Sequence, residues 1–192
     1  MQRKPWTLGV VAATLIWATA ASAGVAVAAQ HTSALAAAEE PGEGLERVVR
    51  PTGQETPPAQ LCIGILGRNL AVYLWLLLGL VSGGLTTVAL LTFNGVALGQ
   101  VAGFALGAGM PIGDLALLTL PHAIPEVAAF LLAGAVGLRG PTLLSAWFKG
   151  TFSRALLTGV SGPVAGGALV IAAAAVIEVF VTVPIARAGV GS

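Results

Sequence analysis

Three acidic residues and one histidine lie within, or at the ends of, long apolar runs of this sequence. They are Asp114, His122, Glu126 and Glu178. A charged side chain at the centre of a membrane helix costs about 2.5–3.5 kcal/mol on insertion scales, so such residues normally face protein or water. Their residue types suit three kinds of site: a polar clamp between helices, a proton or solute pathway, or a metal or catalytic centre.

His122 and Glu126 are four residues apart and therefore share one face of a helix. We expect the imidazole and the carboxylate to hydrogen-bond and so to offset part of each other's desolvation. Asn69 and Asn94 are expected to supply amides from neighbouring spans, and Glu178 completes a predicted intramembrane polar cluster. The clamp is the favoured interpretation, ahead of the pathway and then of the metal or catalytic site.

The sequence gives little support to an enzyme. A zinc protease would use His-Glu-x-x-His, and a tetrahedral metal site needs three or four ligands. The only histidine besides His122 is His31, in a polar stretch, and a single cysteine, Cys62, rules out a disulfide within the chain. No nucleophile elbow, phosphate loop or paired-cysteine motif occurs. We therefore expect no catalytic residue, no metal and no cofactor.

The elements that position these residues are predicted to be membrane-spanning helices. Hydrophobic residues make up 56% of the chain, charged residues 9%, and the mean hydropathy is +0.92. About 20 helical residues cross the hydrocarbon core. Long apolar runs occupy residues 6–29, 61–110, 115–138 and 164–185. The second run is too long for one span, so we predict an all-α polytopic transmembrane helical bundle of about five spans.

The turn inside the second run has two candidate positions. A turn at Ser82-Gly83-Gly84 gives two spans of ordinary length, whereas a turn at residues 92–95 leaves a short second span. The first position is favoured. In the following span, Pro121 and Pro125 each remove a backbone donor, so that helix is expected to begin at Pro121 or to be kinked there.

The chain divides into three predicted parts. Residues 1–29 form an N-terminal transmembrane helix, residues 30–60 a polar extracytoplasmic loop rich in glutamate, and residues 61–192 a four-helix core. The string Ala21-Ser22-Ala23 would suit a cleaved secretory signal, but the apolar run is longer than such a signal needs, which favours a retained helix. Within the core, residues 139–158 form a basic cytoplasmic connector, either a helix lying in the membrane interface or an ordinary link.

The distribution of basic residues predicts the orientation. Arg3 and Lys4 precede the first span, and Arg139, Lys149 and Arg154 follow the fourth. The positive-inside rule places both groups in the cytoplasm, so the N-terminus is cytoplasmic and the C-terminus extracytoplasmic in a multi-pass protein of the cell membrane. Arg68 is an exception near the outer end of the second span, where we expect it to snorkel or to pair with a loop glutamate. The net charge of +1 gives no nucleic-acid footprint.

Glycines at a spacing of four residues predict a close helix contact. The stripe comprises Gly95, Gly99, Gly103 and Gly107, and a stripe without side chains lets another helix approach closely. The small residues Ala129, Ala133 and Gly137 of the next span have the same spacing and are the expected partner. Dimerisation through the glycines is the alternative.

Several segments resemble a known family. They are residues 93–99 (FNGVALG), 120–126 (LPHAIPE) and 133–138 (AGAVGL), with Arg68-Asn69-Leu70, Gly84-Leu85-Thr86 and residues 177–182 (IEVFVT). In order and spacing they resemble the stage II sporulation protein M family over residues 61–185. Ala123 and Pro125 depart from the glycine and leucine that family members commonly have there.

The resemblance implies a small multi-span protein without enzymatic activity. The member that gives the family its name is a membrane anchor for cell-wall hydrolases during sporulation engulfment, and other members accompany bacteriocin production and self-immunity genes. The leading hypothesis is thus a bacterial membrane scaffold or anchor in a cell-wall remodelling or export complex. Its expected partners are the lipid bilayer and other membrane or cell-envelope proteins, with a homo-oligomer as a further option. The alternative is a permease-like subunit in which Asn94, His122, Glu126 and Glu178 line a path for protons, lipid or peptide. The resemblance does not establish a part in sporulation.

Overall fold

The structure is a computed structural model that describes residues 4–38, 57–157 and 159–188. Throughout these ranges the regular elements are helices, and no strand occurs among them. The α-helices are α1 (Lys4–Ala38), α2 (Pro58–Leu77), α3 (Leu85–Gly107), α4 (Ile112–Gly137), α5 (Gly140–Phe148), α6 (Ser161–Ile177) and α7 (Val183–Arg187). The prediction of an all-α protein is confirmed.

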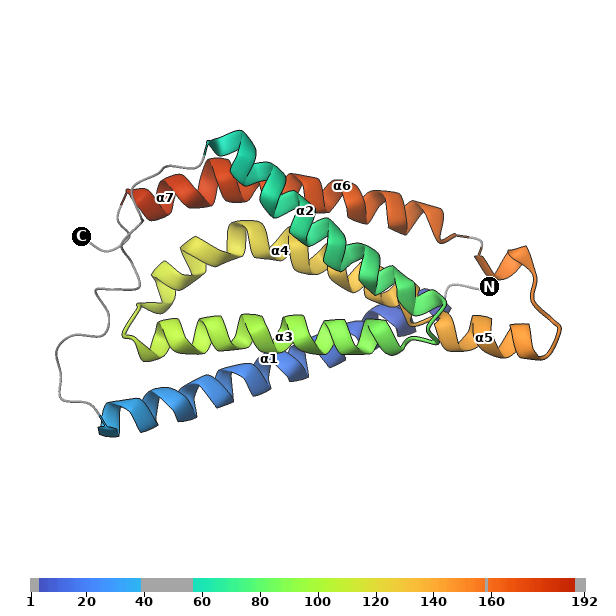
Figure 1. Cartoon of the computed structure of the whole chain (residues 1–192), viewed down its shortest axis with the longest axis horizontal. Coiled ribbons are helices and arrows are strands. Elements are labelled where there is room, and N and C mark those ends of the chain that lie inside the picture. The colour runs from blue at the N-terminus through green and yellow to red at the C-terminus, as the bar shows by residue number, and fades with distance from the viewer. Residues whose placement is uncertain (1–3, 39–56, 158, 189–192) are drawn as a thin grey trace.

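Three short helical turns complete the described part of the chain. Two are 3-10 turns, η1 (Leu78–Leu80) and η2 (Arg154–Leu157). The third, η3 (Glu178–Thr182), is a π-helical turn that joins α6 to α7 without a break, so that the three elements form one rod (Figure 1).

Five helical segments of the described chain are long and apolar enough to cross a membrane. They are Trp6–Thr32, Pro58–Leu80, Leu85–Gly107, Ile112–Phe148 and Ser161–Arg187. They lie lengthwise in an elongated bundle. In this bundle α3 packs along α1, and both α2 and α6 pack against α4 (Figure 1). The predicted five-span bundle is confirmed in fold class.

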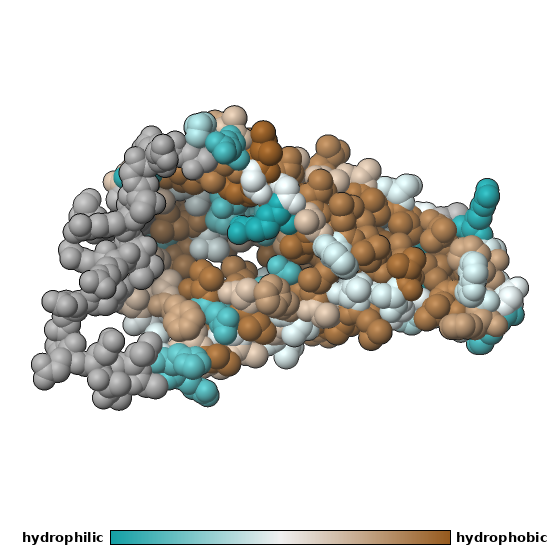
Figure 2. All heavy atoms as spheres, viewed as in Figure 1, coloured by the Kyte–Doolittle hydropathy of each residue, from teal (hydrophilic) through white to brown (hydrophobic). Residues whose placement is uncertain are grey.

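The bundle has an apolar core and an apolar outside. Tyr73, Leu76, Leu91, Phe130 and Ile171 are buried where α2, α3, α4 and α6 meet. The outward surface is also largely hydrophobic (Figure 2). A helix that is apolar on all sides is unfavourable in water. In a bilayer this outer surface faces lipid.

The turn between the second and third spans lies where the sequence favours it. Gly83 has φ 63° and Gly84 has φ 86°, which are left-handed conformations that glycine adopts without a steric penalty. The Gly84 amide donates a hydrogen bond to the carbonyl of Gly79, and α3 begins at the next residue. The turn predicted at Ser82-Gly83-Gly84 is therefore confirmed.

The predicted boundary at residue 29 differs from the structure. Helix α1 continues to Ala38, so residues 30–38 are helical rather than part of a loop. Residues 34–38 are four alanines and one leucine, which have high helix propensity, and the glutamates that suggested a loop begin only at Glu39. Most of the predicted loop, with Glu39, Glu40, Glu43, Glu46 and Glu55, lies outside the described residues.

Helix α4 does not begin at Pro121. It starts at Ile112 and includes both Pro121 and Pro125. The helix bends along this part of its course (Figure 1), as expected where proline removes backbone donors. The kinked alternative therefore holds.

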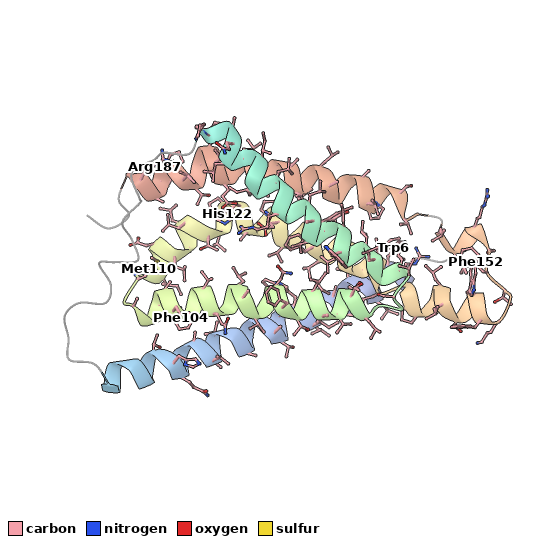
Figure 3. All side chains as sticks on the ribbon, in the orientation of Figure 1. Trp6, Phe104, Met110, His122, Phe152 and Arg187 are labelled. Carbon is pink, nitrogen blue, oxygen red and sulfur yellow. The ribbon has the colours of Figure 1, made fainter. Side chains whose placement is uncertain are left out.

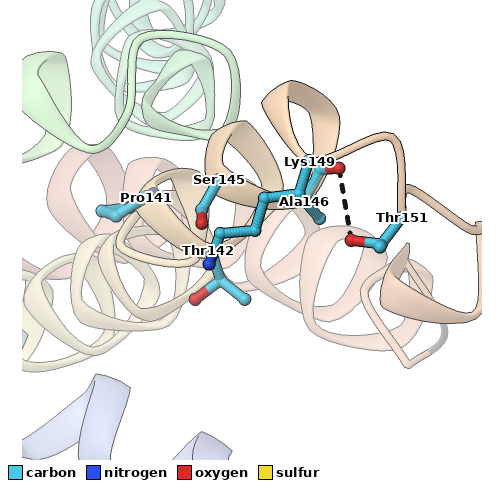
Figure 4. Close-up of a pocket in the computed structure, with 6 residues that line it drawn as sticks. All are labelled: Pro141, Thr142, Ser145, Ala146, Lys149 and Thr151. Atoms are coloured by element: carbon cyan, nitrogen blue, oxygen red, sulfur yellow. Dashed lines mark hydrogen bonds between the residues drawn. The ribbon is translucent and has the colours of Figure 1, made fainter.

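Helix α5 extends beyond the end of the bundle along the same long axis (Figure 1). A helix lying in the membrane interface would instead cross that axis, so the picture favours the ordinary connector. A hollow of about 460 Å³ at α5 is lined by Pro141, Thr142, Ser145, Ala146, Lys149 and Thr151. Thr151 Oγ1 donates a hydrogen bond of 3.4 Å to the carbonyl of Ala146 (Figure 4).

Candidate functional site

A polar contact joins α4 to the last membrane helix. His122 Nδ1 lies 3.2 Å from Thr182 Oγ1, and Thr182 is buried. The two helices run in opposite directions (Figure 1), so Glu126, four residues after His122, comes to face Glu178, four residues before Thr182. Two polar pairs are thus stacked between the same two helices.

The residues of the last helix that face His122 and Glu126 belong to the π turn η3. Glu178 begins this turn and Thr182 ends it. A π turn is rare, appears mostly as a single turn inside an α-helix, and is frequently found at functional sites.

A cavity of about 480 Å³ lies beside these pairs, between α1, α2, α3 and α4. Its polar lining comes from three helices: Arg68 and Asn69 on α2, Asn94 on α3 and Glu126 on α4. The rest of the wall is apolar and consists of Trp17, Val72, Phe93, Ala97, Leu98, Val101, Val127 and Phe130. We call this cavity the polar chamber. Figure 2 shows hydrophilic surface around a hollow on the flank of the bundle.

The amides of the polar chamber differ in how they are satisfied. Asn94 Nδ2 donates a hydrogen bond of 2.8 Å to the carbonyl of Leu90, one turn earlier in α3. Asn69 is only 4% exposed, and its Nδ2 finds no hydrogen-bond partner within the described residues. A buried donor without a partner costs about 1–3 kcal/mol, so this amide favours any acceptor that enters the chamber.

Charges of both signs surround Glu126. Arg68 attracts its carboxyl group, Glu178 repels it, and the Asn69 amide lies close to it. Asn69 does not donate a hydrogen bond to the Glu126 carboxyl group, because its Nδ2 has no partner at acceptable geometry. Among the described residues no ion pair within 4.0 Å joins Arg68 to Glu126. Both groups therefore face the chamber with capacity for further contacts.

The structure brings the predicted polar residues close together, in a different pairing. Asn69, Asn94 and Glu126 line the chamber, while Glu178 and His122 lie on the α6 side of α4. The predicted hydrogen bond between His122 and Glu126 is absent from the described part of the chain. The facing helix offers the imidazole a hydroxyl, so His122 bonds across to Thr182 rather than along its own helix.

Two residues of the site were not predicted from the sequence. Arg68 lines the polar chamber, while the loop glutamates expected to pair with it lie outside the described residues. Thr182 supplies the partner of His122. The spacing held a clue, since Glu178 and Thr182 are four residues apart, like His122 and Glu126 on the facing helix.

Within residues 4–38, 57–157 and 159–188, no three His, Cys, Asp or Glu side chains lie close enough to hold a metal ion. The described site offers hydrogen-bond donors, acceptors and two opposite charges. It is suited to binding a polar group or to joining helices.

The glycine stripe packs against α1. A Cβ atom added to Gly95 would lie 2.6 Å from the carbonyl oxygen of Trp17, and one added to Gly103 would lie 2.6 Å from the Cβ of Ala28. Gly99 meets the backbone at Ala21 with even less space. Helices α1 and α3 therefore touch backbone to backbone, as small residues at four-residue spacing permit.

The partner predicted for this stripe was wrong. The stripe residues Gly95 to Gly107 meet α1, whereas Gly137 packs against Thr87 and Leu76. Ala129 and Ala133 belong to the buried core with Tyr73 and Ile171. The sequence contains two small-residue stripes, and spacing alone does not say which helix each one meets.

Comparison with known proteins places the chain in a family. The family model of stage II sporulation protein M matches residues 9–183. An uncharacterized protein of Methanocaldococcus jannaschii, MJ0793, is 35% identical over 77 residues. That match covers 40% of this chain and 43% of the relative, so it spans less than half of either protein. No solved structure matches.

The family match covers all five candidate spans in whole or in part, together with the polar chamber and the His122–Thr182 contact. The resemblance seen in the sequence is therefore confirmed. The chain is a multi-pass membrane protein that belongs to the stage II sporulation protein M family.

Proposed function

We propose that this chain is a non-enzymatic membrane scaffold, an anchor that holds other membrane or cell-envelope proteins at the bilayer. The observation that carries the proposal is the hydrogen bond between His122 and Thr182. This bond joins α4 to the last helix, so the intramembrane residue His122 has a structural role. A scaffold needs such a bundle to be fixed in shape, and needs no reactive group.

The proposed partner contacts lie on two parts of the chain. One is the glutamate-rich segment between α1 and α2, and the other is the lipid-facing surface of the helices. The glutamates offer charges to a protein outside the membrane, while the apolar surface offers packing to a membrane-embedded one.

Affinity purification from native membranes with quantitative mass spectrometry tests the proposal. The wild type is compared with a variant in which Glu39, Glu40, Glu43, Glu46 and Glu55 are changed to glutamine, and with Lys149→Gln as a control of unrelated charge. We expect the glutamine variant to fold and to lose specific partners that the control keeps. A chain that copurifies with no specific protein in native membranes contradicts the scaffold role.

A second candidate is a permease-like subunit, and the polar chamber favours it. A cavity with Arg68, Asn69, Asn94 and Glu126 within an apolar bundle is unusual for a purely structural protein, because buried polar groups are costly. Loss of a solute flux in Glu126→Gln, with folding and partners unchanged, would support this candidate over the scaffold.

A further inference from the structure

We propose that the polar chamber binds the headgroup of a zwitterionic phospholipid, one that carries a phosphate and a primary ammonium. This binding site goes beyond the scaffold role and does not depend on it. The proposal is built from the lining charges, the unpartnered amide, and the depth and opening of the cavity.

The donors of the polar chamber suit a phosphate. The Arg68 guanidinium carries a permanent charge and several N–H groups that fit phosphate oxygens. Asn69 Nδ2, on the same helix, is buried and lacks an acceptor among the described residues. A phosphate oxygen placed between them would satisfy both groups.

The acceptors of the chamber suit an ammonium group. Glu126 lines the same cavity from α4. Asn94 uses its Nδ2 within α3, so the group it offers the chamber is the Oδ1 acceptor. A primary ammonium can donate hydrogen bonds to these oxygens, whereas a trimethylated one cannot.

The position of the chamber favours a molecule that arrives from the lipid. The hollow opens on the flank of the bundle (Figure 2). Asn69 lies at the middle of the Pro58–Leu80 span, so the proposed binding draws the headgroup from the membrane interface into the bundle, where Arg68 and Glu126 replace its contacts with water. Phe93, Leu98 and Val101 form an apolar wall that suits acyl chains. The volume of about 480 Å³ falls within the usual range of small-ligand sites, roughly 300–1,000 Å³.

Lipid binding to the purified full chain, followed by native mass spectrometry, tests the proposal. Phosphatidylethanolamine, phosphatidylcholine and phosphatidylglycerol with identical acyl chains are compared. Phosphatidylcholine lacks ammonium hydrogens and phosphatidylglycerol lacks the amine. We expect phosphatidylethanolamine to bind about tenfold more tightly than either, the difference expected for charge-assisted hydrogen bonds. Equal binding of the three lipids overturns the proposal.

Matched variants locate the binding. Arg68→Gln removes a phosphate contact common to the three lipids and should weaken the binding of each about tenfold, whereas Glu126→Gln should reduce the preference for phosphatidylethanolamine about tenfold. Lys149→Gln and Asp114→Asn remove the same charges elsewhere and should leave both unchanged. Ala97→Leu fills the chamber without altering a charge and should weaken binding while helix content, measured by circular dichroism, stays at the wild-type value. Unchanged lipid binding in a folded Ala97→Leu variant overturns the proposed site.

A competition arm identifies the source of the headgroup. Soluble O-phosphoethanolamine has the same phosphate and ammonium but no acyl chains. We expect it to leave the bound lipid in place at concentrations where a diacyl competitor displaces it. If the soluble compound displaces the lipid equally well, the source is a free polar metabolite and the lipid part of the proposal is wrong.

Discussion

His122 Nδ1 and Thr182 Oγ1 lie 3.2 Å apart although the two residues are 60 positions apart in the chain. Thr182→Val keeps the shape of the side chain and removes the hydroxyl. Interhelical hydrogen bonds in membranes contribute about 0.6 kcal/mol on average and up to about 1.7 kcal/mol. We expect the variant to lose stability within this range, measured by unfolding in mixed micelles.

Thr14→Val is the matched control for this substitution. The Thr14 hydroxyl donates a hydrogen bond to the carbonyl of Val10 within its own helix. Its removal should change stability less than the removal of the Thr182 hydroxyl. Equal effects of the two variants would show that the contact across the helices adds nothing.

A bulky residue in the glycine stripe should separate α1 from α3. Gly99 has no room for a Cβ atom because the backbone at Ala21 occupies the space, whereas Gly64 on α2 has nothing within 4 Å. Overpacking costs about 1–3 kcal/mol. We expect Gly99→Leu to lower the free energy of unfolding by that amount and Gly64→Leu to leave it nearly unchanged. Loss of a dimer in Gly99→Leu, at constant monomer stability, would instead support the dimerisation alternative.

The mature protein should contain α1. The stripe on α3 packs against Trp17, Ala21 and Ala28, so removal of this helix would expose backbone that is now covered. The family match also begins within α1. Intact mass spectrometry of the protein from native membranes should give a mass that includes residues 6–32. A mass that starts after Ala23 would show that the segment is a cleaved signal.

Cysteines introduced at the two ends of the bundle should react with a maleimide from opposite sides of the membrane. Met110 lies at one end and Phe152 at the other (Figure 3). In a Cys62→Ala background, Met110→Cys should react with an impermeant maleimide in intact cells, and Thr151→Cys should react only after permeabilisation. The reverse pattern would contradict the orientation that the positive-inside rule predicts.

The sequence predicted the fold well because hydropathy and turn residues act locally. Apolar run lengths give the five spans, and Gly83 and Gly84 supply the left-handed conformations of the turn. The pairing of helices could not be predicted from the sequence, because spacing alone makes any small-residue stripe a possible partner of any other. The contacts of Gly99 with α1 and of His122 with Thr182 depend on how the spans are arranged in three dimensions.

A double-mutant cycle of His122→Ala and Thr182→Val tests most directly the central claim that intramembrane polar groups join the helices. The readout is the free energy of unfolding in mixed micelles, with partner retention in native membranes measured on the same variants. The account predicts a coupling energy of about 0.6 kcal/mol or more, and a loss of partners that follows the loss of folded protein. Additive effects on stability, with partners kept and a solute flux lost, would contradict it and favour a polar pathway.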